Sequence, residues 1–227
     1  MSLPSNVHLS SHPCLQAKLS LIRSSSTTPA GDKRLGVEAF SGLKLVKTGT
    51  DTTPLGIEYE TQGIDPADLA LVPILRSGLG MVDALNDLLP TPVPVYHLGL
   101  FREKVSLQPV EYYNNLPFHR SELSPASPAS LNPTTNTAAA SLAVLLDPVI
   151  ATGATAEAAI QLLRDWGVKK VIMLSLLASE EGVKRAAGTW SEVEIWVGGI
   201  DKGVDEKGMI VPGIGDIGDR LFVAIGK

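Results

Sequence analysis

Short apolar runs of strand length alternate with helical patterns along most of the chain from residue 69 onward. The run at residues 142–146 is continuously apolar, the pattern of a strand that is buried on both faces of a parallel sheet. The runs predicted as strands are residues 69–75, 93–101, 110–113, 142–146, 171–177, 194–199 and 221–225. Their alternation with helices predicts an α/β fold, with a doubly wound, mainly parallel sheet and right-handed crossovers.

Helices are predicted between these runs at residues 81–89, 154–166 and 180–187. One face of the second helix carries apolar residues at three- and four-residue spacing, namely Ala156, Ala159, Ile160, Leu163 and Trp166. Gly167 follows directly and is placed to end that helix. Ligands of open sheets bind at the carboxyl ends of strands, so chemistry is expected in loops 76–80, 147–155 and 208–220.

The 227 residues are predicted to form one domain with two additions. Residues 1–62 are polar and weakly periodic, and we expect them to form an N-terminal arm. Residues 121–141 are almost entirely Ser, Pro, Thr, Ala and Asn. Such a segment buries too little apolar surface to offset its ordering entropy, so we expect a disordered surface insertion.

Charge and composition exclude several classes of protein. The chain has 44 % hydrophobic and 19 % charged residues, which is a globular composition, and its net charge is −5. An acidic protein has no overall positive field that would hold nucleic acid or an anionic membrane. The chain shows no apolar signal segment and no apolar run near the ~18 residues that span a bilayer, so we expect a soluble, cytoplasmic protein.

A metal site is considered at His8, His12 and Cys14 because of their spacing. No second cluster completes the four ligands that a structural site needs, so we expect no metal ion held by protein side chains. Cys14 is the single cysteine and cannot form an internal disulfide.

A phosphate-binding turn is one interpretation of residues 142–155. There, a buried strand is followed by Asp147, a turn of small residues and the start of a helix. Backbone amides at a helix N-terminus attract an anion, and Thr152 and Thr155 add hydroxyl donors. The turn lacks the Gly-Lys-Ser/Thr of nucleoside triphosphatases. The alternative is an ordinary strand-to-helix turn in which Thr155 caps the helix.

Residues 213–218 match the dinucleotide-binding pattern Gly-x-Gly-x-x-Gly. That motif needs a helix after it and an acidic residue about 20 positions on, whereas here the chain runs into the apolar residues 221–223. We therefore expect a glycine-rich loop whose backbone groups face a ligand, with a plain C-terminal turn as the alternative. Arg76 and Arg102, each at the exit of a predicted strand, add positive charge at the same edge of the sheet.

Four segments together resemble the uracil phosphoribosyltransferase family, in its order and at about its spacing, from about residue 72 to residue 222. These are residues 72–81, residues 102–112, Asp147-Pro148 with Ala151-Thr152-Gly153, and residues 210–220. The last segment is highly specific, because other phosphoribosyltransferases share the phosphate turn but not this terminal loop. Residues 6–8, and His12-Pro13 together with Lys18, also resemble the N-terminal arm of the family.

The resemblance implies transfer of ribose 5-phosphate from 5-phosphoribosyl 1-diphosphate (PRPP) to N1 of uracil, which gives UMP and diphosphate in pyrimidine salvage. The implied catalytic residues are Arg102, Asp147 and Asp216. The implied PRPP-binding residues are Arg76, Arg102, Asp147, Pro148, Val149, Ile150, Ala151, Thr152, Gly153, Ala154, Thr155 and Asp216. The implied uracil-binding residues are Met209, Ile210, Gly215, Asp216 and Ile217.

The resemblance also implies Mg²⁺ as a cofactor that PRPP carries into the site. Residues 101–117 resemble a mobile hairpin that, with the N-terminal arm and the C-terminal loop, forms a hood over the site. A homodimer or homotetramer is implied, and whether GTP acts as an effector stays open.

Three positions depart from the family pattern. Met209 and Phe101 replace tyrosines, Ala154 replaces a glycine, and the family's helical segment before the first core strand is shortened to residues 32–40. None of these changes removes a phosphate or base contact outright. They do motivate an alternative, a catalytically weak or inactive relative that binds UMP or uracil and acts as a regulatory or partner-binding domain.

Overall fold

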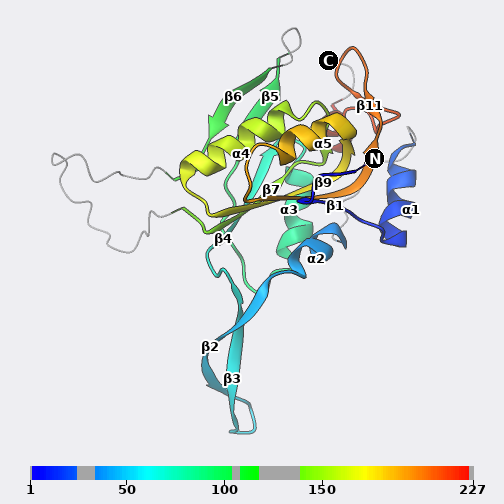
Figure 1. The fold of residues 1–227 in the computed structure, drawn as a ribbon. Helices are drawn as coiled ribbons and strands as arrows, with labels where there is room; N and C mark the ends of the chain where they lie inside the picture. The colour runs from blue at the N-terminus through cyan, green and yellow to red at the C-terminus, as the bar shows by residue number, and fades with distance from the viewer. Residues whose placement is uncertain (1, 25–33, 104–107, 118–138, 225–227) are drawn as a thin grey trace, which may run out of the picture.

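The structure is a computed structural model that describes residues 2–24, 34–103, 108–117 and 139–224. Within these ranges an eight-stranded sheet forms the centre of the molecule (Figure 1). The strand order is β1-β10-β9-β7-β4-β5-β6, and β8 pairs with β9. These strands are β1 (Val7–Leu9), β4 (Leu69–Leu75), β5 (Leu98–Arg102), β6 (Pro109–Asn114), β7 (Leu142–Leu146), β8 (Val149–Ile150), β9 (Lys170–Ser179) and β10 (Val193–Asp201).

Strand pairing in this sheet is parallel except between β5 and β6, which form an antiparallel hairpin. Helices cover both faces. The helices α4 (Ala154–Trp166) and α5 (Glu180–Ala187) lie on one face, and α1 (Pro13–Ile22), α2 (Arg34–Phe40) and α3 (Leu79–Asn86) lie on the other (Figure 1). The predicted α/β fold with a doubly wound, mainly parallel sheet is confirmed.

Apolar periodicity placed the central elements correctly. The observed bounds of β4, β7, α4 and α5 are those predicted from the pattern. Gly167 ends α4 in a left-handed conformation with φ of 100°, as expected. At the other end, Gly153 caps the helix with φ of 80° and no side-chain hydrogen bond, so the interpretation of Thr155 as the cap is wrong.

Two predicted strands differ from the structure. Residues 93–97 are not a strand, and only Val95 forms a single bridge, to Leu71, before β5 begins at Leu98. Pro92 and Pro94 explain this, because proline has no N–H to donate to a ladder. The strand expected at residues 221–225 is also wrong over its described part, since Leu221 ends the short helix α6 (Ile217–Leu221). The Asp216 carboxylate caps that helix by accepting from the Asp219 N–H at 3.1 Å.

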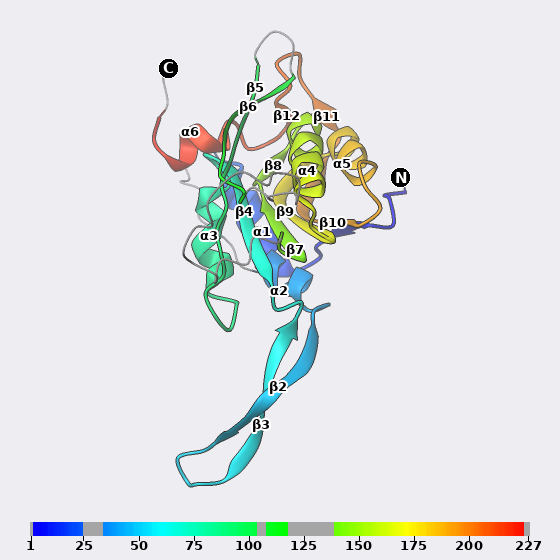
Figure 2. The ribbon, with the colours of Figure 1, turned by 90° about the vertical axis from the view of Figure 1, so that its left-hand side faces the viewer.

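The predicted arm, residues 1–62, contains more regular structure than its polar pattern indicated. It holds β1, α1, α2, β2 (Lys44–Thr52) and the start of β3 (Glu58–Asp65). The β2–β3 hairpin projects away from the sheet in both views (Figures 1 and 2). Nearly all residues of the hairpin are exposed, so no alternation of apolar and polar positions marks it in the sequence.

The predicted insertion, residues 121–141, lies mostly outside the described residues, which resume at residue 139. Ser141, at its end, donates through its backbone N–H and its hydroxyl to the Asp68 carboxylate.

Candidate active site

One cavity of about 340 Å³ lies at the carboxyl edge of the sheet and gathers four segments of the chain. Arg76 and Ser77 enter it after β4, and Asp147, Val149 and Ala151 enter it after β7. The β5–β6 hairpin contributes Leu100, Phe101 and Tyr112. The fourth segment is the loop from Gly208 to Gly218, called here the base loop, and its lining residues are Gly208, Met209, Ile210, Ile214, Gly215, Asp216, Ile217 and Gly218.

A smaller cavity of about 70 Å³ adjoins the first and shares Asp147, Val149 and Ala151 with it. Its other lining residues are Ile150, Thr152, Gly153, Thr155 and Ala156. It lies at the N-terminus of α4, where free backbone N–H groups and the helix dipole favour an anion. The pair of cavities therefore joins an anion-sized recess to a larger chamber.

Close backbone packing holds the turn at this recess, residues 151–153. A Cβ atom placed on Gly182 of α5 would lie 2.1 Å from the Ala151 carbonyl oxygen, and one on Gly153 would lie 2.4 Å from the Gly182 oxygen. The Ser179 hydroxyl donates to the Ala151 carbonyl and accepts from the Gly182 N–H at 2.8 Å, so it caps α5 and fastens the turn together. The turn and the start of α5 can adopt this spacing because neither glycine has a side chain.

Asp147 lies between the two cavities and is 8 % exposed. The Ser77 hydroxyl donates to its carboxylate at 3.3 Å. Burial raises the pKa of the Asp147 carboxyl to about 7, and hydrogen bonds from Val149 and Ser77 partly oppose this rise. A carboxyl group with this pKa changes between its protonated and ionised forms near neutral pH. In the ionised form it can accept hydrogen bonds from a hydroxylated ligand.

Arg76, from the neighbouring strand, follows β4 at the turn into α3. Its guanidinium donates to the Asp219 carboxylate at 2.8 Å and is half exposed to solvent. A Cβ on Gly78 would lie 2.3 Å from the Leu146 carbonyl oxygen, so this turn packs directly against the end of β7. The positive charge of Arg76 and the carboxylate of Asp147 therefore face one chamber from adjacent strands.

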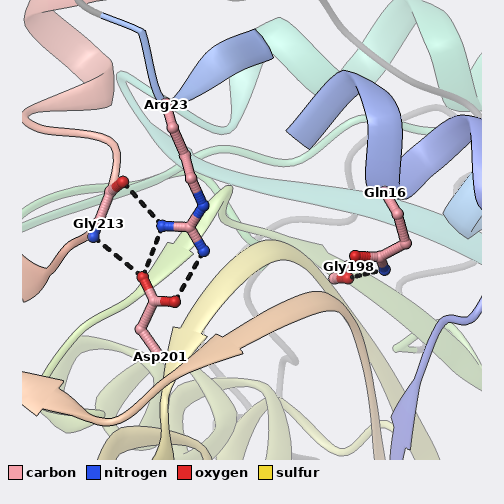
Figure 3. A network of polar contacts seen from close by, with 5 residues as sticks. All are labelled: Gln16, Arg23, Gly198, Asp201 and Gly213. Carbon is pink, nitrogen blue, oxygen red and sulfur yellow. Dashed lines mark hydrogen bonds and ion pairs between the residues drawn. The ribbon is translucent and has the colours of Figure 1, made fainter. Parts of the chain in front are cut away.

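Two charged side chains that are not in the cavity lining, Arg23 and Asp201, fasten the base loop (Figure 3). The Arg23 guanidinium, at the end of α1, contacts both Asp201 carboxylate oxygens, at 2.7 and 2.8 Å. It also donates to the Gly213 carbonyl at 3.0 Å, and the Gly213 N–H donates to Asp201 at 2.9 Å. The hydrogen bonds from Arg23 hold the pKa of Asp201 below its usual range, so this carboxylate stays charged.

Most predicted site residues meet at these cavities. The two cavities bring together Arg76, Asp147, Val149, Ile150, Ala151, Thr152, Gly153, Thr155, Met209, Ile210, Gly215, Asp216 and Ile217. Pro148 and Ala154 are the exceptions in the lining, since the Pro148 carbonyl accepts from Leu176 and Leu177, and Ala154 is buried. The side chain of Arg102, the remaining predicted site residue, lies outside the described part of the structure, and its backbone pairs with Pro109 in the hairpin, next to Phe101.

Ser77, Ser179, Gly182, Arg23 and Asp201 support the site and were not singled out in the sequence. Ser179 had a usable signal, because a serine followed by two acidic residues at the end of a strand is typical of a helix N-cap. Arg23 and Asp201 had none, because 178 positions separate them.

The expectation that no helix follows the glycine pattern of residues 213–218 is wrong, because α6 begins inside it at Ile217. The two-residue strand before it, β12 (Ile210–Val211), pairs antiparallel with β11 (Gly203–Val204) and does not belong to the parallel sheet. The pattern therefore lacks the strand-turn-helix unit of a dinucleotide-binding turn.

The histidines of the arm have structural contacts. His8 stacks on Trp196 with ring centroids 4.3 Å apart, and His12 accepts from the Cys14 N–H at the start of α1. In the part of the chain that the structure describes, no three His, Cys, Asp or Glu side chains are grouped to hold a metal ion. Nor does any helix in those ranges have the length and apolar character needed to cross a membrane.

The fold and the paired cavities define the class of protein. A parallel sheet whose carboxyl edge joins an anion recess, a buried carboxylate and a larger chamber is the architecture of a phosphoribosyltransferase, an enzyme. The family model described as uracil phosphoribosyltransferase matches residues 9–224. The chain belongs to the uracil phosphoribosyltransferase family.

Individual relatives agree with this assignment. The chain is 38 % identical to the uracil phosphoribosyltransferase of Roseiflexus castenholzii, over 95 % of this chain and 97 % of the relative. It is 37 % identical to that of Desulfitobacterium hafniense, over the same shares. Among solved structures, the AQ2163 protein from Aquifex aeolicus matches with a TM-score of 0.78 and 28 % identity, over 95 % of this chain and 97 % of that one.

The contact between Gly182 and Ala151 predicts a binding defect in Gly182→Ala. The added methyl group would push the turn away from α5 and misplace its amides, so we expect UMP to bind at least about tenfold more weakly. Titration calorimetry with UMP measures the effect. Gly188→Ala, at the other end of α5, is the matched control because its Cβ would come no closer than 3.4 Å to a neighbour. Equal affinity in both variants would contradict this account of the turn.

The buried Asp147 carboxyl predicts a pH-dependent stability. Its folded-state pKa of about 7 exceeds the unfolded value of about 3.9, so its stabilising contribution is complete below pH 4 and is lost as pH rises to 7. Asp147→Asn mimics the protonated form. Relative to wild type, we expect the variant to gain about 3 kcal/mol in free energy of unfolding between pH 4.5 and 8.

Urea unfolding at several pH values measures this difference. Asp83→Asn, on the exposed side of α3, is the matched control. A stability difference between Asp147→Asn and wild type that stays constant with pH would contradict the raised pKa.

Proposed function

We propose that this chain transfers ribose 5-phosphate from PRPP to N1 of uracil, which yields UMP and diphosphate in pyrimidine salvage. The observation that carries the proposal is the junction of the two cavities at Asp147. The smaller recess, at the N-terminus of α4, has the size of a phosphate group. The chamber beside it is lined by Arg76, which follows β4, and by the base loop. The membership of the chain in the uracil phosphoribosyltransferase family supports the same reaction.

The recess is the proposed site for the 5-phosphate. Residues Ala151 to Thr155 would surround it with backbone N–H groups, and the hydroxyls of Thr152 and Thr155 line the same recess. Asp147, at the junction, would accept hydrogen bonds from the ribose hydroxyls. Because the pKa of Asp147 is near 7, only part of the protein carries the ionised carboxylate at neutral pH, and PRPP would bind to this form. In the molecules whose Asp147 is still protonated, binding of PRPP would release the proton.

The diphosphate of PRPP is proposed to lie toward Arg76 and Arg102. The Arg76 guanidinium already donates to the Asp219 carboxylate, and a diphosphate oxygen could take the place of that carboxylate oxygen. Among the described residues, the carboxylates that line the larger cavity are those of Asp147 and Asp216, and Mg²⁺ is usually held by one or two carboxylates together with the phosphates of a substrate. Mg²⁺ is therefore proposed to enter with PRPP, where it would neutralise charge on the leaving diphosphate.

Uracil is proposed to bind along the base loop, where backbone groups of Ile210, Gly215 and Ile217 would read its edge, with Met209 and Asp216 beside it. Backbone recognition explains why cytosine would be rejected. An N–H group that faces the position-4 oxygen of uracil would face an amino group in cytosine, and two opposed donors cost about 1–3 kcal/mol.

The chemistry is a substitution at the anomeric carbon. The bond from this carbon to the diphosphate oxygen breaks, the bond to N1 forms, and the N1 proton is released. Charge develops on the leaving diphosphate, where Arg76 and Arg102 would act. Phe101 and Tyr112, with ring centroids 6.0 Å apart, lie on the hairpin that would shield the activated sugar from water.

The alternative, an inactive relative that binds UMP or uracil, has one specific motive. Met209 lines the chamber where the family resemblance placed a tyrosine. No charged group of the proposed site is missing from the sequence, so we favour the enzyme.

Self-assembly into a homodimer or homotetramer is proposed on the basis of the β2–β3 hairpin. Two-stranded hairpins are marginal by themselves, and this one exposes Leu45, Leu55, Ile57 and Tyr59. We expect sedimentation to show an oligomer, and the double change of Leu55 and Ile57 to serine to weaken it. Leu79→Ser, an exposed leucine on α3, is the control. A monomeric wild type would contradict the proposal. The same samples, with and without GTP, show whether GTP changes the mass of the oligomer or the rate of UMP formation.

The activity is tested by UMP formation from labelled uracil, PRPP and Mg²⁺. We expect turnover by the wild type, and for Arg102→Ala a fall of kcat by roughly 10²–10³-fold with a smaller change in uracil affinity, because the diphosphate loses a stabilising charge. Arg164→Ala, an exposed arginine of α4 outside both cavities, is the matched control. No turnover alongside measurable UMP binding would establish the alternative instead.

A further inference from the structure

Two arginines from opposite ends of the chain hold the base loop from behind. Arg23, just after α1, reaches Asp201 at the end of β10 and the Gly213 carbonyl (Figure 3). Arg220, in α6, reaches back and donates to the Ile22 carbonyl at 2.7 Å, the Ser24 carbonyl at 2.7 Å and the Ile214 carbonyl at 2.6 Å. The end of the arm and the base loop thus hold each other through reciprocal contacts.

Apolar packing lies directly under these polar contacts. Leu19 and Ile22 of α1 form a buried cluster with Leu177 of β9 and with base-loop residues Ile210, Ile214 and Ile217. Since Ile210 and Ile217 also line the chamber, the layer between arm and cavity is one side chain thick. A shift of α1 would therefore be transmitted to the wall of the cavity.

Gly213 is the point on which the polar contacts converge. It is buried, its φ is +63°, and a Cβ on it would lie 2.1 Å from the Ile210 carbonyl oxygen. A glycine in this conformation has no side chain to hold it, and its backbone is intrinsically free. Here its N–H is bound by Asp201 and its carbonyl by Arg23, so one ion pair fixes both sides of the residue.

We propose that Arg23 and Asp201 are positioning residues that set the affinity of the site for the nucleobase, by fixing Gly213 and through it the backbone from Ile210 to Ile217. Neither side chain lines the cavity, so both act through the loop. The proposal rests on the proposed function insofar as the base loop is taken to bind uracil. The N-terminal arm thereby becomes a determinant of base binding.

The contacts of Arg23 and Asp201 lead to a selective kinetic effect. The phosphate recess is fastened by Ser179 and Gly182, and Arg76 lies after β4, so the side-chain hydrogen bonds of Arg23 and Asp201 reach neither. We expect Arg23→Ala and Asp201→Asn to raise the KM for uracil by roughly tenfold to a hundredfold. The KM for PRPP and kcat at saturating uracil stay within about twofold of wild type. Arg23→Lys, which keeps the charge but not the two-pronged contact, gives an intermediate KM for uracil.

Lys170→Ala is the matched control. Lys170 forms an ion pair with Glu194 at 2.7 Å, which joins the same two strands, β9 and β10, at the end away from the base loop. Loss of that pair removes a cross-strand contact of similar length without touching the loop, so both KM values are expected to match wild type.

Amide hydrogen exchange gives a readout that needs no activity. We expect faster exchange in peptides covering residues 208–218 in Arg23→Ala and Asp201→Asn, and wild-type exchange there in Lys170→Ala. Unchanged exchange, or a parallel rise of the KM for uracil and for PRPP, would overturn the proposal. Failure of all three loop variants to fold would overturn it too, because the pair would then be purely structural. An inactive wild type would refute the proposed function alone, and the exchange result would still test the positioning of the loop.

Discussion

The site depends on one constraint, a carboxylate buried at the end of a central strand. β7 lies between β4 and β9 and is covered by helices on both faces, so the residue that follows it emerges beneath loops and not into solvent. Asp147 occupies that position, with the Ser77 hydroxyl from the neighbouring loop against it. Burial raises the pKa of Asp147 to about 7, so the same topology that places the group also sets its charge. Both cavities are arranged around this residue.

Three close approaches of backbone complete the arrangement. At Gly78, Gly182 and Gly213 a Cβ atom would collide with a backbone carbonyl oxygen. The distances are 2.3 Å to Leu146, 2.1 Å to Ala151 and, within the base loop itself, 2.1 Å to Ile210. Each of these contacts belongs to a different wall: the basic strand end, the phosphate recess and the base loop. The high glycine content of the chain, 21 residues, thus acquires a partial explanation, because loops that approach this closely can present backbone groups to a ligand. An acidic protein can in this way hold a polyanion with few cationic side chains.

The interior of the fold could be predicted from the sequence because burial on both faces leaves a strong pattern. β4, β7, α4 and α5 were predicted with their observed bounds, and the turn after Asp147 was recognisable from its small residues. The β2–β3 hairpin and α6 could not be found in the same way, because exposed strands and a five-residue helix leave no periodicity. Asp147 and Arg76 were identifiable by their position after strands, whereas Arg23 and Asp201 meet only through the fold. The alternative in which Thr155 caps α4 was wrong, because the cap is Gly153, which turns the chain through its left-handed conformation without a side-chain hydrogen bond.

The place of β1 in the sheet has a consequence for how the chain reaches its structure. Val7 pairs with Ile195, so β1 is an edge strand whose partner, β10, is made long after it. Contacts between such distant parts of a sequence carry a large entropic cost of loop closure and form slowly. The arm therefore has no docking surface until β10 exists, and the end of α1 has no base loop to hold until the C-terminal residues follow. During synthesis the carboxyl edge of the sheet is complete only after the base loop and α6 are made, so a chain that stopped before them would lack part of the site and would leave the end of α1 without its contacts to Gly213 and Arg220.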